Sequence, residues 1–76
     1  MGKYKSYGSS YSVEGLTPLH RFVKKDSPEF RFYCNHGTFI LYEVRKEHKQ
    51  RVVINSTQMT NIMSMLDKNG WQEVRA

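Results

Sequence analysis

The hydrophobic pattern of this chain changes its period once, at Asn55, and this change limits the folds that the sequence can adopt. Before Asn55, apolar and polar residues alternate, as they do in strands with one buried face. After Asn55, apolar residues recur at helical spacing, which places them on one side of a helix. The strand segments are residues 19–24, 29–35, 38–46 and 51–54, and the helical stripe is Met59, Ile62, Met63 and Leu66.

Short polar reversals separate the four strand segments. Residues 25–28, 35–37 and 47–50 have turn or loop composition, and Gly37 can adopt the positive φ that a tight hairpin requires. Strands joined this closely pair antiparallel. The sequence therefore predicts an α+β fold, in which a curved antiparallel sheet of four strands packs one face against a C-terminal helix. Residues 71–76 form either a fifth short strand or a segment that lies across the sheet.

Both ends of the expected helix carry capping signals. Asn55 is a typical N-cap residue, and Gln58 stands where a capping box places its second member. At the other end, Gly70 suits the left-handed position that follows a helix. Trp71 is then expected to contact Leu66, which lies in the last turn.

A chain of 76 residues is long enough for one small domain with a modest core. We expect this domain over residues 18–76, preceded by a flexible basic arm, rich in tyrosine, serine and glycine, over residues 1–17. The arm is either a frayed terminus or a segment whose tyrosines stack on bases while its lysines meet phosphates. No apolar run approaches the roughly 18 residues of a membrane span, so no membrane partner is expected. One cysteine and no leader segment favour a reducing, cytoplasmic location.

One helix can cover only one face of such a sheet. The covered face is expected to carry Phe30, Phe32 and Cys34, with apolar residues of the neighbouring strands. By alternation, the opposite face is expected to carry Arg31, Tyr33, Arg51, either Arg21 or Lys24, and one or two aromatic residues of segment 38–46. Aromatic rings among arginines suit a surface where bases stack and phosphates pair.

The net charge points to the same kind of partner. The chain has 12 Lys and Arg residues against 7 Asp and Glu residues, a formal net charge of +5. An ordinary solvated surface also explains scattered basic residues, but basic residues among aromatic rings favour a non-catalytic protein that binds single-stranded DNA or RNA. The candidate nucleic-acid-binding residues are Lys3, Tyr4, Lys5, Arg21, Lys24, Arg31, Tyr33, Arg45, Lys49 and Arg51.

Groups that could catalyse a reaction or hold a metal ion are few and dispersed. Cys34 and His36 would share a strand face, but Cys34 is more simply a core residue and His36 a turn residue. The histidines lack the paired spacing of zinc sites, so neither a metal nor another cofactor is expected. A ribonuclease that uses His20, His36 or His48 as general base is a less favoured alternative, and no catalytic residue is assigned.

A resemblance to known families rests on the order of two strands, a basic loop and a helix. These elements are found in the run FILYEVRKEHKQRVVINSTQMTNIMSML. The run resembles part of the single-stranded nucleic-acid-binding modules of the transcriptional positive cofactor four, Whirly and Pur families. Those families generally act as dimers, so the resemblance implies a homodimer with Met63, Met65 and Trp71 as candidates for the contact surface.

A role in protein binding is the main alternative to nucleic-acid binding. A small regulator of viral or plasmid type would dock on a host protein through an exposed strand edge, Met65, Trp71 and the tyrosine-rich arm. Its positive charge would steer it toward an acidic partner. Salt-sensitive binding of an oligonucleotide separates the two hypotheses, because only the first requires it.

Overall fold

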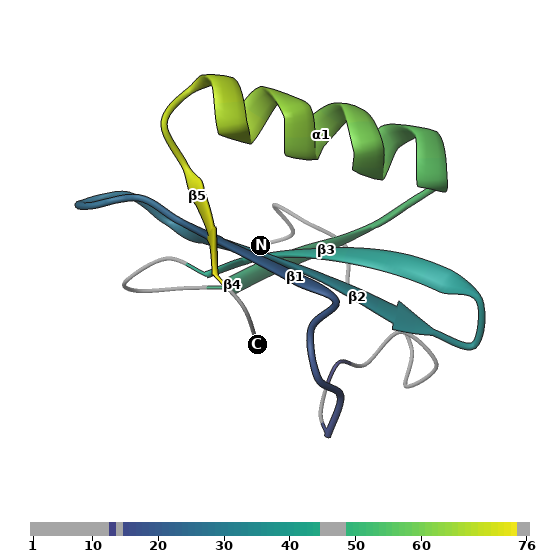
Figure 1. Cartoon of the computed structure of the whole chain (residues 1–76). Coiled ribbons are helices and arrows are strands. Elements are labelled where there is room, and N and C mark those ends of the chain that lie inside the picture. Colours follow the sequence, from purple (N-terminus) through teal and green to yellow (C-terminus); the bar gives the residue numbers. More distant parts are fainter. Residues whose placement is uncertain (1–12, 14, 45–48, 75–76) are drawn as a thin grey trace.

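Five strands and one helix make up the protein in a computed structural model that describes residue 13 and residues 15–44 and 49–74. In chain order they are β1 (His20–Val23), β2 (Glu29–Asn35), β3 (Thr38–Val44), β4 (Lys49–Ile54), α1 (Ser56–Lys68) and β5 (Gln72–Val74). The helix lies over one face of the sheet (Figure 1). The predicted α+β fold, with an antiparallel sheet and a C-terminal helix, is confirmed.

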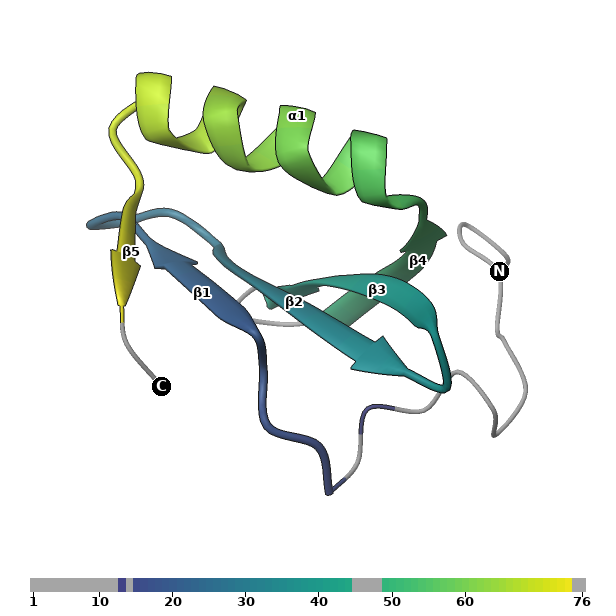
Figure 2. The same ribbon diagram turned by 45° about the vertical axis from the view of Figure 1, so that its right-hand side comes forward.

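The sheet is an antiparallel meander to which the last strand is added at the far side. Its strand order is β4-β3-β2-β1-β5, and every neighbouring pair is antiparallel. The helix connects β4 at one side to β5 at the other (Figure 2). Its 13 residues span roughly 20 Å, which matches the roughly 19 Å covered by four steps between strands. Of the two possibilities for the C-terminal segment, the short strand is the one observed.

A two-residue turn fixes how β2 and β3 align. Asn35 pairs with Thr38, and the two residues between them, His36 and Gly37, have φ values of 53° and 78°. Two consecutive positive φ angles are those of a type I′ turn, whose twist matches that of paired strands. The sequence predicts a positive φ for Gly37, and in the structure His36 adopts a positive φ as well. Because the turn is this short, the register places Arg31 opposite Tyr42.

The core lies between the helix and the sheet face that it covers. Phe22, Phe32, Ile54 and Leu66 are its buried members, and the other residues of the helical stripe pack against them. Phe32 has no exposed surface. The expectation that Cys34 belongs to this core is wrong, because its side chain is exposed. Cys34 lies near the hairpin end of β2, where it pairs with Phe39.

The helix ends as its capping signals predict. The Asn55 side chain accepts a hydrogen bond from the backbone N–H of Gln58 at 2.7 Å, and the Gln58 side chain accepts one from the Asn55 N–H at 2.9 Å. At the other end, Gly70 has a φ of 96°, and the Trp71 N–H donates to the carbonyl of Leu66 at 3.0 Å. These bonds form a capping box and a Schellman motif, which satisfy backbone groups that the helix leaves unpaired.

Replacing Asn55 with alanine is expected to lower the free energy of unfolding by about 1 kcal/mol, because the Gln58 N–H loses its acceptor. Urea unfolding followed by circular dichroism measures the change. Asn61→Ala is the matched control, since Asn61 is exposed in the middle of α1. An equal loss in both variants would contradict the capping role of Asn55.

Candidate nucleic-acid interface

The face opposite α1 carries a row of cationic and aromatic residues that runs across four strands. Arg21 of β1 pairs with Arg31 of β2, Arg31 pairs with Tyr42 of β3, and Tyr42 pairs with Arg51 of β4. Directly paired residues project from the same face of a sheet, so these four side chains form one line. We call them the arginine row. At about 4.8 Å per strand, the row extends over roughly 14 Å.

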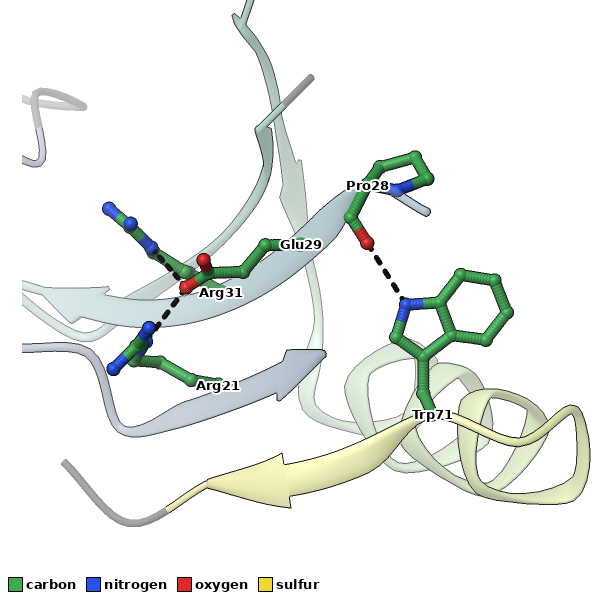
Figure 3. A network of polar contacts seen from close by, with 5 residues as sticks. All are labelled: Arg21, Pro28, Glu29, Arg31 and Trp71. Carbon is green, nitrogen blue, oxygen red and sulfur yellow. Dashed lines mark hydrogen bonds and ion pairs between the residues drawn. The ribbon is translucent and has the colours of Figure 1, made fainter. Parts of the chain in front are cut away.

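Glu29 holds two members of the arginine row. Its Oε2 accepts a hydrogen bond from the Nε of Arg21 and another from the Nε of Arg31, each at 2.7 Å (Figure 3). Two like charges directly opposite each other in a sheet destabilise it. A carboxylate bonded to both guanidinium groups removes this repulsion, so Glu29 explains how Arg21 and Arg31 can be paired.

The charges of this cluster are fixed by its hydrogen bonds. Burial by itself raises the pKa of Glu29, but the hydrogen bonds and positive charges of Arg21 and Arg31 outweigh it and lower this pKa below its ordinary value of 4.5. Hydrogen bonds with Glu29 and Tyr33 raise the pKa of Arg31. Glu29 and Arg31 are therefore both ionised at neutral pH.

The contacts with Glu29 leave donors for a ligand. A guanidinium group carries five N–H donors in a planar fork, and Arg21 and Arg31 each contact Glu29 through Nε. The Nη atoms at the ends of both side chains can donate to a phosphate, which guanidinium groups bind through paired hydrogen bonds. Both side chains keep about one third of their surface exposed, at 33% for Arg21 and 32% for Arg31.

Part of the sheet face opposite α1, near the β2–β3 hairpin, is closed to solvent. Tyr33 and Ile40 lie on the side away from α1, yet Tyr33 is only 4% exposed and Ile40 is 0% exposed. Residues 15–19 run on the same side of the sheet before β1 begins (Figure 1 and Figure 2). The expectation that Tyr33 presents a free ring for stacking is therefore wrong. Its ring makes an edge contact with Tyr42, with centroids 6.1 Å apart, and Tyr42 keeps part of its surface exposed.

The other basic candidates are placed differently. Arg21, not Lys24, occupies the face opposite α1. The Lys24 Nζ donates to the carbonyl of Asn69 at 2.7 Å and lies 4.6 Å from the centre of the Trp71 ring, so Lys24 belongs to the end of the helix. Lys49 lies in β4, where it pairs with Val44 of β3. The candidates that lie outside the described residues are Lys3, Tyr4, Lys5 and Arg45.

The three candidates for a protein contact do not form one surface. Met63 packs against the core. Trp71 also packs against it, with its ring 5.6 Å from that of Phe30, and its Nε1 donates to the carbonyl of Pro28 at 3.0 Å (Figure 3). Both side chains are only partly exposed, and the expectation that they contact a partner stays a prediction. Met65 is 56% exposed on α1.

The groups considered for catalysis or metal binding are also separated. His20 Nδ1 lies 2.6 Å from Glu73 Oε2, between β1 and β5, whereas His36 is exposed in the hairpin turn. His48 lies outside the described residues. Within residues 15–44 and 49–74, no group of three or more His, Cys, Asp or Glu side chains is arranged to hold a metal ion.

Two residues of the interface were not among the sequence candidates. Tyr42 was one of several aromatic residues in its segment, and Glu29 was not singled out. A two-residue turn between Asn35 and Thr38 is sufficient to pair Arg31 with Tyr42, so the hairpin was the signal that could have identified Tyr42. The role of Glu29 depends on Arg21 lying opposite Arg31 in the neighbouring strand. This pairing is known only from the register of β1 against β2.

Comparisons with known proteins add no family to these observations. The chain matches no protein-family model, no curated protein and no solved structure. The resemblance to the positive cofactor four, Whirly and Pur modules thus stays a prediction. In the described part of the chain, no helix has the length and apolar character needed to cross a membrane.

Proposed function

We propose that this protein binds single-stranded nucleic acid, without catalysing a reaction on it, through the arginine row. The observation that carries the proposal is the register that aligns Arg21, Arg31, Tyr42 and Arg51 on the sheet face opposite the helix. Three guanidinium groups in line are suited to consecutive phosphates, and the aromatic ring among them is suited to a base.

The charge balance of the face supports a polyanionic ligand. Glu29 offsets one of the three positive charges of the arginine row, so the row keeps a net positive charge. A formal net charge of +5 for the whole chain would attract a polyanion over a longer range. The ligand is single-stranded because a ring on a sheet can stack only on a base that has left a duplex.

Replacing Arg51 with alanine tests the proposal without disturbing Glu29. We expect binding of a labelled oligothymidylate, measured by fluorescence anisotropy, to weaken at low salt. The plot of log affinity against log salt should also become less steep by about 0.7, the contribution of one phosphate contact on a single strand. Lys68→Ala, which removes an equal charge from the last turn of α1, should change both quantities less.

Other outcomes would contradict the proposal. The same affinity at low and high salt would exclude phosphate contacts. Binding of a sulfated polysaccharide as tight as that of an oligonucleotide with equal charge would favour an acidic protein partner instead. Cleavage of the oligonucleotide that disappears on mutation of one histidine would identify a nuclease.

A further inference from the structure

We propose that the bound strand crosses the sheet along the arginine row, perpendicular to the β-strands, with one base stacked on Tyr42 and its flanking phosphates on Arg31 and Arg51. This inference rests on the proposed function and adds to it the direction of the ligand and the place of a base. It starts from the position of Tyr42, which is paired with Arg31 on one side and with Arg51 on the other.

The direction follows from what surrounds the arginine row. A polyanion that ran along β2 would leave Arg31 and reach Glu29 at one side or the buried Tyr33 at the other. Along β3 it would pass from Tyr42 to the buried Ile40 or to the apolar Val44. Across the strands, cationic residues follow one another with Tyr42 between them. Among the described residues, this is the direction in which a phosphate chain meets successive guanidinium groups.

The place of the base follows from the spacing. Arg31 and Arg51 are two strand steps apart, roughly 10 Å, and Tyr42 occupies the step between them. Phosphates bound by the two arginines would therefore lie on either side of the Tyr42 ring, and the base between them would lie against it. Stacking on an aromatic ring is tolerant of sequence because every base has a π face.

Tyr33 supports this arrangement although its own ring is buried. Its ring makes an edge contact with the Tyr42 ring. Glu29 restrains Arg31 by accepting a hydrogen bond from its Nε. The guanidinium group of Arg31 and the ring of Tyr42 are thus held before a ligand arrives, which lowers the entropic cost of binding. Tyr33 and Glu29 are positioning residues in this account.

Two probes of equal charge test the inference: a labelled oligothymidylate and a strand of the same length with abasic sites. We expect the wild-type protein to bind the thymidylate more tightly, by about five- to a hundredfold for one stacked base. Tyr42→Leu should remove most of this preference. Tyr42→Phe, which keeps the ring, should retain it. Val44→Ala, a change two residues along β3 on the same face, should retain it as well.

Photocrosslinking of the wild-type protein gives a second readout that needs no variant. An oligonucleotide with 5-iodouracil should crosslink to Tyr42, as identified by mass spectrometry of the digested complex. Crosslinks at other residues alone, or a thymidylate preference that survives in folded Tyr42→Leu, would overturn the inference. Equal, salt-sensitive binding of the two probes by the wild type would overturn it and leave the proposed function standing. Binding of neither probe would refute the proposed function itself.

Discussion

Replacing Phe32 with alanine is expected to cause the largest loss of stability of any change considered, and to raise the fraction of unfolded molecules at 25 °C. Phe32 has no exposed surface, and its ring makes edge contacts with Phe22 and His20 at centroid distances of 5.9 and 6.3 Å. Truncating a buried phenylalanine costs about 3–5 kcal/mol. A chain of 76 residues has a free energy of unfolding of only roughly 4–11 kcal/mol, so this one change removes much of it.

Urea unfolding of Phe32→Ala, followed by circular dichroism, measures this loss. Met65→Ala is the matched control, because it also removes a large apolar side chain, but from a site that is 56% exposed. It should change the free energy of unfolding by less than about 0.5 kcal/mol. A loss below 1 kcal/mol in Phe32→Ala would show that the core does not depend on the face of the sheet under α1.

The parts of this fold that could be predicted from the sequence are those set by residues close together in the chain. The capping pair of Asn55 and Gln58 lies within one turn, so the start of the helix follows from local hydrogen bonds. The hairpin of β2 and β3 likewise depends on the turn at His36 and Gly37. Alternation along β2 places Arg31 and Tyr33 on the face away from α1, as expected, although Tyr33 is buried there.

The remaining features depend on contacts between distant segments. β5 pairs with β1 only because α1 carries the chain across the sheet, and three residues from Gln72 to Val74 are too few for a recognisable strand pattern. Alternation places Tyr33 and Ile40 on the face without the helix, but it cannot show that both are buried there. The bond from Trp71 to Pro28 joins residues 43 positions apart.

Replacing Glu29 with glutamine is expected to have the second-largest effect on stability. The neutral amide loses the attraction to two guanidinium groups and leaves Arg21 directly opposite Arg31. Bonds to charged groups contribute about 1.5–3 kcal/mol each, and partial exposure of all three side chains reduces this value. We therefore expect a loss of about 1–3 kcal/mol at pH 7. Thermal unfolding should show it as a fall of about 4–8 °C for each kcal/mol.

The pH dependence of this loss identifies its cause. The folded protein lowers the pKa of Glu29 below 4.5, so the carboxylate stabilises the fold fully above the pKa of the unfolded chain, and this contribution disappears as the pH falls through the lowered value. The difference in stability between the wild type and Glu29→Gln should thus be largest near neutral pH and shrink below pH 4.5. Asp67→Asn, the same chemical change at an exposed position of α1, should show a smaller difference at neutral pH. A Glu29→Gln difference that stays constant down to pH 3 would mean that Glu29 acts through packing, because only the ionised carboxylate can neutralise both arginines.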